Sequence, residues 1–311
     1  MKTNAFSQDF PVASSWWGTF FGTTLGYRRF LRWRSEKHSA MLWPCDMYDE
    51  HDDHDLEADA RYASIDAMLA AERLDGVAIV TPPQTHLSLV NTALELGLPV
   101  FVEKPLSEDH NENERFLAGF SSGVLVVGYI LRHHAGLQKV SSVEVREALG
   151  DALAVRYVRR TRRPRPQGAA PVTTLGVHGL DVIAWLFGQP LMSAVTDCTS
   201  MTEDEASFRL EFPKGRTGRF DVAWSAAEEQ RVVEVQGANG RARLDFGSGA
   251  LTLDLDHEPV RTVSVDTNEP LRAQWLYFLE RCRSPETTVF PSKQRLLDQS
   301  AWLQSHGQQD S

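Results

Sequence analysis

Long apolar runs alternate with helical patterns in the stretch from Asp75 to about Tyr129. The runs "DGVAIVTPP", "LPVFV" and "VLVVGY" contain almost no polar residue, which is typical of strands covered on both faces. Only about a dozen helix-patterned residues separate the first two runs, and so short a crossover indicates a right-handed βαβ unit with parallel strands. We expect helices over residues 85–97, with Thr85 as a capping residue, and over about 113–120. The pattern predicts half of a doubly wound domain, whose ligand binds beyond the carboxyl ends of the strands.

The pattern changes after Gly150, where polar and apolar residues begin to alternate. The segments "ALAVRYVRR", "SFRLEFP", "GRFDVAW", "RVVEVQG" and "RARLDF" are joined by turn residues, which favours an antiparallel sheet. Helical patterns cover residues 177–187, 270–283 and 291–306. The predicted fold is therefore a Rossmann-like α/β domain over residues 1–130, followed by an α+β domain over residues 131–311 with an open, mainly antiparallel sheet.

Composition narrows the class of protein. The 311 residues are 42% hydrophobic and 24% charged, which is ordinary for a globular protein of two domains. The net charge of −10 disfavours nucleic acid as a partner. The three cysteines have neither disulfide-framework nor zinc spacing, and no apolar run approaches the roughly 20 residues needed to span a bilayer. We expect a cytoplasmic protein without a membrane partner.

Candidate chemistry begins in "FVEKP", where Lys104 follows an apolar strand. One interpretation is that Lys104 marks the solvated end of the strand. The other is functional, because burying an ammonium is costly unless its charge is used. Since ligands of doubly wound domains bind at the carboxyl ends of the strands, the position of Lys104 favours the functional interpretation.

Two motifs carry a resemblance to a known family. The stretch "DGVAIVTPPQTHLSLVNTALELGLPVFVEKPLSED" resembles the Thr-Pro-Pro, His and Glu-Lys-Pro signature of the Gfo/Idh/MocA oxidoreductases in order and spacing. The segment "LGVHGLDVIAWLFGQP" resembles the Gly-x-His-x-x-Asp helix of that family, and "VEVQGANGRARLDF" is a weaker match to a hairpin of its second domain. The resemblance extends from Asp75 to the end of the chain.

The resemblance implies an NAD(P)-dependent oxidoreductase that transfers hydride between nicotinamide and a secondary hydroxyl or ketone of a sugar, nucleotide-sugar or polyol. It implies that Lys104 stabilises developing alkoxide charge and that His178 takes part in proton transfer. Glu103 and Pro105 would hold the backbone at Lys104, and in this family the Lys-Pro peptide is often cis. Asp181 would accept a hydrogen bond that orients His178.

Further site residues follow from the same resemblance and from strand ends. Expected on the cofactor side are Thr81, Pro82, Pro83, His86 and Glu103. Expected near the substrate are Thr174, Asp181, Tyr129, Arg132 and Arg163. Thr174 departs from the family pattern, because many relatives carry an aspartate at this position and threonine cannot act as a base.

The N-terminal stretch departs from the family more strongly. Gly18, Gly22 and Gly26 are spaced by four and follow no clear strand, unlike a Gly-x-Gly-x-x-Gly loop. Residues 13–45 are therefore either strongly diverged or translated from a shifted reading frame. We predict contacts of Gly18 and Gly22 with the cofactor, and of Asp46 with its ribose. A ribose-binding acid disfavours a 2′-phosphate, so NAD is favoured over NADP.

Alternatives remain for the charged tracts and for the function. The six arginines of 156–165 form either a solvated loop or a border of the active site that suits phosphorylated substrates. The acidic tract 49–59 is expected to be a solvated helix start, so no metal site is predicted. The alternative function is a catalytically lapsed relative that senses a cofactor or sugar, or serves a partner protein. Family members commonly pair through the open sheet, which implies a homodimer or homotetramer.

Overall fold

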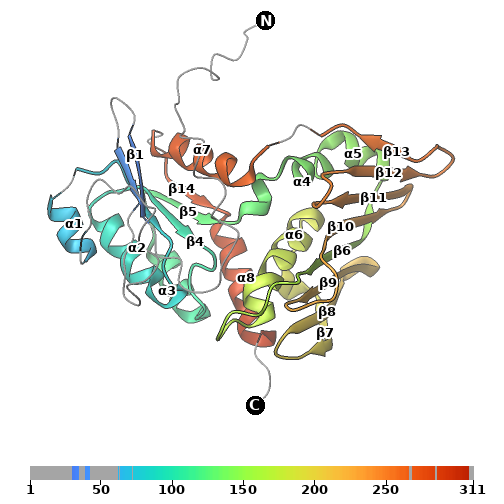
Figure 1. Ribbon diagram of the computed structural model, residues 1–311, viewed down its shortest axis with the longest axis horizontal. Coiled ribbons are helices and arrows are strands. Elements are labelled where there is room, and N and C mark those ends of the chain that lie inside the picture. The colour runs from blue at the N-terminus through green and yellow to red at the C-terminus, as the bar shows by residue number, and fades with distance from the viewer. Residues whose placement is uncertain are drawn as a thin grey trace, which may run out of the picture.

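The computed structural model describes residues 30–34, 39–42, 62, 64–71, 73–265, 268–283 and 286–307. Within these ranges the chain forms two sheets with helices between and around them (Figure 1). Gly18, Gly22, Asp46 and the acidic tract 49–59 lie outside the described residues. No helix in the described part is long and apolar enough to cross a bilayer.

The first sheet has the strand order β1-β2-β3-β4-β5-β14 among the described residues. Strands β3, β4, β5 and β14 run parallel, β2 is parallel to β3, and β1 is antiparallel to β2. All residues of β3 and β5 are buried, as their continuous apolar sequences predict. The strands are β1 (Phe30–Arg34), β2 (Ser39–Leu42), β3 (Gly76–Ile79), β4 (Val100–Glu103), β5 (Val124–Gly128) and β14 (Thr288–Phe290).

Helices follow the strands of this sheet in the predicted order. Asp109 caps α3 by accepting a hydrogen bond from the Glu112 backbone N–H at 3.1 Å. Thr85 does not cap α2 as we expected, because its hydroxyl instead donates to the Pro82 carbonyl at 2.9 Å. The helices are α1 (Ile65–Ala71), α2 (His86–Glu95), α3 (His110–Gly119) and α7 (Pro270–Cys282), with a 3₁₀ turn η1 (Pro83–Thr85) before α2.

The second sheet has eight strands in the described part of the chain, in the order β13-β12-β11-β10-β6-β9-β8-β7. Neighbours are antiparallel except β6 and β9, which are parallel. Burial alternates along β8, as expected for a sheet with one covered and one open face. The strands are β6 (Ala152–Arg160), β7 (Val195–Met201), β8 (Glu205–Phe212), β9 (Arg216–Ala223), β10 (Gln230–Gly237), β11 (Gly240–Asp245), β12 (Leu251–Leu255) and β13 (Arg261–Val263).

Helix α6 covers one face of the second sheet and lies between the two sheets (Figure 1). The turn η3 immediately before it has the wide hydrogen-bonding pattern of a π-helix, a form that is frequent at functional sites. The helical elements of this domain are η2 (Ile130–His133), α4 (Ala135–Val140), α5 (Val143–Leu149), η3 (Val172–Gly176), α6 (Val177–Phe187), η4 (Leu191–Ser193) and η5 (Pro213–Gly215).

The C-terminal segment returns to the first domain. We expected residues 131–311 to form the second domain, but β14 pairs in parallel with β5 and α7 packs against Phe101 of β4. Helix α8 (Lys293–His306) then runs between the domains, where its Trp302 packs on Phe208 and Phe220 of the second sheet. The chain end therefore fastens the two domains to each other.

Candidate active site

Lys104 follows β4 at the carboxyl end of the first sheet, as the sequence predicts. The Lys104–Pro105 peptide is cis. The Lys104 ammonium crosses to the other domain and donates a hydrogen bond to the Thr174 carbonyl at 3.1 Å. Burial lowers the pKa of Lys104 from its ordinary value near 10.5, and the neighbouring Glu103 carboxylate opposes part of that shift.

Glu103 and His86 support the turn that carries Lys104. The Glu103 carboxylate accepts a hydrogen bond from the Lys104 backbone N–H at 3.3 Å, and burial raises the pKa of this carboxyl. His86 is fully buried, with Nδ1 at 2.7 Å from the Pro105 carbonyl and Nε2 at 2.8 Å from the Thr81 carbonyl. Because burial lowers the pKa of His86 and favours the neutral ring, one nitrogen donates to its carbonyl, and the imidazole packs between the ends of β3 and β4.

Thr174 meets Lys104 through its backbone rather than its side chain. Its hydroxyl donates to the Ala170 carbonyl at 2.6 Å and accepts from the Trp224 indole at 3.3 Å. Thr174 lies in the π-type turn η3, four residues before His178. The position at which the family resemblance implies an aspartate therefore supplies a carbonyl acceptor for Lys104.

His178, on the first turn of α6, lines a cavity of about 510 Å³ between η2, the start of α7 and the second sheet. Burial holds the pKa of His178 well below 6.5, and the charges of Lys104, Arg159 and Arg231 lower it further. The imidazole is consequently neutral at neutral pH. The charge of Lys104 acts on His178, although Lys104 is not among the residues that line this cavity. The polar lining includes His134, Tyr157, Arg159, His178, Arg231 and Glu269.

Three residues expected near the substrate are engaged elsewhere. Asp181 does not orient His178: it forms an ion pair with Arg132, whose Nε and Nη2 lie 2.9 and 2.7 Å from its carboxylate oxygens. The reason is geometric, because the Asp181 side chain faces η2 whereas His178 lines the cavity. The Tyr129 hydroxyl is buried and donates to the Gln299 side-chain carbonyl. These contacts join η2 and the end of β5 to α6 and α8.

Arg163 is exposed, and its charge contributes to lowering the pKa of Arg231.

Sequence reasoning missed three lining residues of the cavity, namely Arg231, Tyr157 and His134. A signal for Arg231 was present, because "RVVEVQG" places it on the same strand face as Val233 and Val235, which turn inward.

The described strand ends fit a nicotinamide group. Thr81 after β3, whose hydroxyl contacts the Thr85 hydroxyl at 2.6 Å, and Lys104 after β4 lie at the edge where doubly wound folds bind dinucleotides. At the end of β5, a Cβ on Gly128 would lie 3.0 Å from the Phe101 ring and 3.1 Å from a Glu103 carboxylate oxygen, so glycine makes room there for the Glu103 side chain. Pro82 and Pro83 shape the turn beside Thr81. Gly18, Gly22 and Asp46, which we predict to contact the remainder of a dinucleotide, lie outside the described residues.

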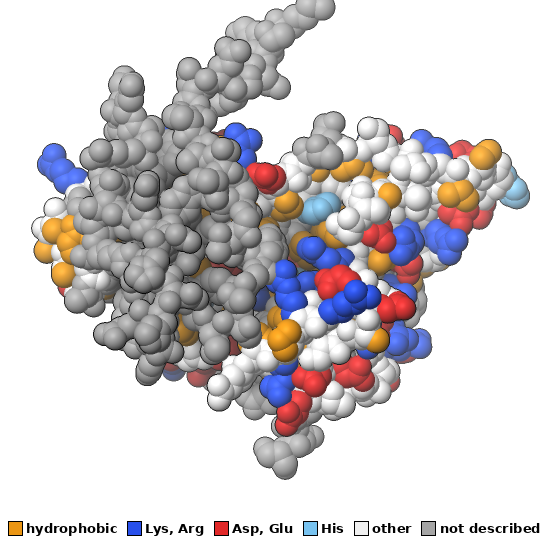
Figure 2. All heavy atoms as spheres, viewed as in Figure 1, with side chains coloured by type: hydrophobic (Ala, Val, Ile, Leu, Met, Phe, Trp, Pro, Cys, Tyr) orange, Lys and Arg blue, Asp and Glu red, His pale blue; other side chains and the backbone are white. Residues whose placement is uncertain are grey.

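Basic and acidic side chains are interspersed over the second domain on the face shown in Figure 2, where they form no extended patch of one sign. This mixture is typical of a solvated surface. Among the described residues no group of three or more histidine, cysteine, aspartate or glutamate side chains could hold a metal ion.

Comparison with known proteins identifies the family. A model of the oxidoreductase family with an NAD-binding Rossmann fold matches residues 46–129, and a model of the GFO/IDH/MocA C-terminal domain matches residues 139–243. Together they match more than half of the chain. The protein belongs to the Gfo/Idh/MocA family of oxidoreductases, as the two sequence motifs predicted.

Individual relatives agree with this assignment. The chain is 25% identical to UDP-N-acetylglucosamine 3-dehydrogenase of Acidithiobacillus ferrooxidans over 253 residues, covering 77% of each protein. It is 33% identical to inositol 2-dehydrogenase of Leifsonia xyli over 138 residues, which cover 42% of this chain and 40% of the relative.

Solved structures share the fold. The structure of the Acidithiobacillus ferrooxidans enzyme is similar with a TM-score of 0.66 at 20% identity, covering 79% of this chain and 82% of that one. A 3-ketoreductase from Actinomadura kijaniata, solved with NADP and TDP-benzene, is similar with a TM-score of 0.66 at 16% identity, covering 79% of this chain and 81% of that one. The predicted architecture of a Rossmann-like domain and an open-sheet domain is thereby confirmed.

Proposed function

We propose that this protein is an NAD(P)-dependent dehydrogenase or reductase that acts on a secondary hydroxyl or ketone of a sugar-type substrate in the cavity beside His178. One observation supports the proposal above all. Lys104 from the first domain and His178 from the second lie within electrostatic reach of each other, and the Lys104 ammonium binds the turn that leads into the His178 helix. His178 lines the cavity, and the Lys104 ammonium lies at the turn η3 that precedes the His178 helix.

The chemistry assigned to the two residues follows from their charge states. A bound nicotinamide supplies the acceptor or donor of hydride. Neutral His178 accepts the hydroxyl proton on an imidazole nitrogen as the substrate is oxidised, and returns it in the reverse direction. The Lys104 ammonium has three N–H groups, of which one is bound to the Thr174 carbonyl, so the others are available to stabilise negative charge on the reacting oxygen.

The relatives support a sugar-type substrate, since their names include dehydrogenases of UDP-N-acetylglucosamine, inositol and D-apiose. NAD is the favoured cofactor because Asp46 occupies the position of a ribose-binding acid. A cytoplasmic homodimer or homotetramer remains the expected state.

The second candidate function is that of a catalytically lapsed relative that binds cofactor or sugar. The departure from the family pattern at Thr174 is the observation that motivates it.

One experiment separates these functions. Purified protein would be titrated with NADH and with NADPH while tryptophan fluorescence is followed. Turnover would then be measured by nicotinamide absorbance on neutral, phosphorylated and nucleotide-linked sugars and on polyols. Binding with turnover is the expected result. Cofactor binding without turnover on the whole panel would favour the lapsed relative, and the absence of both would contradict the proposed function.

A further inference from the structure

Two arginines lie directly opposite each other on the cavity face of the second sheet. Arg159 of β6 pairs in register with Arg231 of β10, and both line the cavity that contains His178. Like charges at directly opposite positions of an antiparallel pair destabilise a sheet. This arrangement therefore calls for a compensating anion or a functional reason.

The described carboxylates compensate these arginines only in part. Glu229 accepts a hydrogen bond from Arg159 and another from the Arg162 backbone N–H at 3.1 Å, and its side chain is 45% exposed. Arg231 forms no side-chain hydrogen bond or ion pair with any of the described residues. Burial lowers the pKa of Arg231, and the charge of Arg159 lowers it further, an effect that the Glu229 carboxylate opposes.

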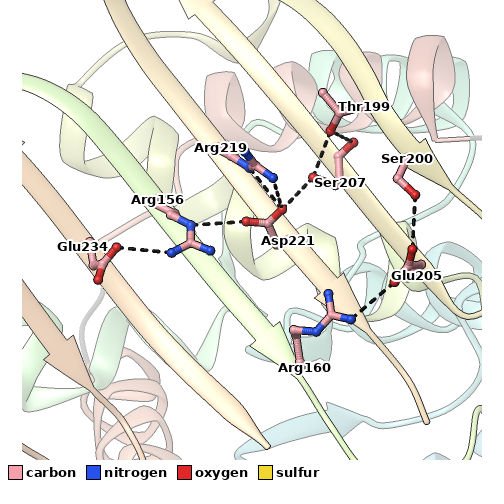
Figure 3. Close-up of polar contacts among 9 residues, drawn as sticks. All are labelled: Arg156, Arg160, Thr199, Ser200, Glu205, Ser207, Arg219, Asp221 and Glu234. Atoms are coloured by element: carbon pink, nitrogen blue, oxygen red, sulfur yellow. Dashed lines mark hydrogen bonds and ion pairs between the residues drawn. The ribbon is translucent and has the colours of Figure 1, made fainter. Parts of the chain in front are cut away.

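Four of the five other arginines of the 156–165 tract are engaged away from the cavity, and the fifth, Arg163, is exposed. Arg156 and Arg160 project from the opposite face of β6, where they bind Asp221 and Glu205 (Figure 3). Arg162 donates to the Ala227 carbonyl at 3.2 Å, and Arg165 pairs with Glu203 and Asp204. Because successive side chains of a strand point to opposite faces, Arg159 faces the cavity whereas Arg156 and Arg160 do not.

We propose that Arg159 and Arg231 together bind an anionic group of the substrate, a carboxylate or phosphate carried by the sugar, within the cavity of His178. This inference rests on the proposed function and adds the substrate class to it. The guanidinium groups supply planar forks that match both kinds of anion. A single anion would also neutralise the opposed charges of the two strands.

An anion at this position would act on His178 as well. Both arginines lower the pKa of the imidazole, so an anion that offsets their charge restores part of its affinity for a proton. A neutral sugar would leave His178 a poorer base. Anionic substrates are therefore expected to gain in kcat as well as in binding.

Direct binding tests the inference independently of hydride transfer. Calorimetry would compare D-glucose with D-glucuronate and glucose 6-phosphate, and D-galactose with D-galacturonate, for the unmodified protein and for Arg231→Gln. We expect at least one anionic sugar to bind more tightly than its neutral partner. Arg231→Gln should weaken that binding about 30-fold, as is usual when one partner of a desolvated charge pair is removed, and leave neutral sugars unchanged.

Two controls identify the cause of any loss. Arg241→Gln removes an equal charge from β11, where Arg241 is 64% exposed and pairs with Asp254, and should leave sugar binding unchanged. The thermal midpoint of Arg231→Gln should equal or exceed that of the unmodified protein, because the substitution relieves like-charge repulsion. A merely structural role of Arg231 would lower it. Comparing glucuronate with glucose 6-phosphate decides between carboxylate and phosphate.

The outcomes separate the inference from the proposed function. Arginine-dependent binding of an anionic sugar without oxidation by NAD or NADP would support the inference and contradict the function. Oxidation of neutral sugars, unaffected by Arg231→Gln and not improved by an anionic group, would overturn the inference and leave the function standing. Equal affinity of both proteins for every anionic sugar, or no binding of any, would also overturn it.

Discussion

The two faces of the second sheet differ in how fully their charged side chains are paired. On the open face, Asp221 is only 6% exposed and is bound by Arg156, Arg219 and Ser207 (Figure 3). On the cavity face, Arg159 and Arg231 oppose each other, and among the described residues only Arg159 has a carboxylate partner, the half-exposed Glu229. Because the same strands β6 and β10 form both faces, neither strand propensity nor overall composition explains the difference. A charged side chain whose hydrogen-bonding partners are all present therefore indicates a structural role. A charged side chain that lacks partners beside a cavity indicates a candidate binding site.

The largest effect is expected at Lys104. Under the proposed function, Lys104→Met removes the only ammonium that reaches from the first domain to the Thr174 carbonyl in the described structure. Loss of one donor to a developing oxyanion typically lowers kcat by about 10²–10³-fold, and we expect the upper end because proton exchange is lost as well. Steady-state kinetics with the best sugar of the panel would measure it.

Lys104→Arg is the matched control, since it keeps the positive charge and changes the shape of the group. It should retain more activity than Lys104→Met, with an unchanged thermal midpoint. If Lys104→Met kept full kcat, the Lys104 ammonium would have no catalytic role.

His178 gives the next largest effect and a distinct pH dependence. His178→Gln should lower kcat by about 10²-fold, because glutamine cannot exchange a proton. Since burial and three nearby cations hold the pKa of His178 below 6.5, the unmodified protein keeps the imidazole neutral as the pH falls through 6.5. The acid limb of kcat/KM should therefore lie below pH 6.5, and activity should be lost only as the pH falls through the lowered pKa.

The lowered pKa of His178 also makes the stability of the fold depend on pH. Between the lowered pKa and 6.5, the unfolded chain binds a proton at His178 that the folded chain does not, so stability decreases as the pH falls below 6.5. His178→Gln should remove this contribution. If kcat/KM has an acid limb at or above pH 6.5, and this limb persists in His178→Gln, the titrating group is not His178.

On the open face, the third change should affect stability without affecting catalysis. Asp221→Asn leaves Arg156 and Arg219 facing each other without their shared carboxylate. Removing one partner of a buried pair costs about 3–5 kcal/mol, and we expect about 2 kcal/mol because both arginines are about half exposed. Urea unfolding would measure the loss of free energy. A lower kcat without loss of stability would contradict the distinction between the two faces.

Much of the fold could be predicted because its signals are local. The continuous apolar sequences of β3 and β5 indicated buried parallel strands, and the range predicted for α6 coincides with Val177–Phe187. The return of β14 to the first sheet was missed because it depends on a long-range pairing of three residues with β5, which no local pattern specifies.

The site was predicted in part for the same reason. Lys104 and His178 lie in local motifs, and the Lys104 ammonium binds the Thr174 carbonyl in the turn before the His178 helix. The partner of Asp181 was assigned wrongly, because its position one turn after His178 suggested a shared face whereas tertiary packing supplies Arg132. Arg231 was missed because its importance depends on the register that sets it opposite Arg159, and register across 72 positions of sequence is not visible in either strand alone.

The smallest effect is expected for a solvated ion pair on the second sheet. Arg241 and Asp254 form an ion pair on neighbouring strands of the second sheet, with side chains 64% and 39% exposed. Such a solvated pair contributes roughly 0–1 kcal/mol, because water screens the attraction and ordering two long side chains opposes it. Arg241→Gln should therefore lower the free energy of unfolding by less than about 0.5 kcal/mol, measured by urea unfolding beside Asp221→Asn. A loss as large as that of Asp221→Asn would show that the burial of the carboxylate is not what separates a structural charge from a solvated one.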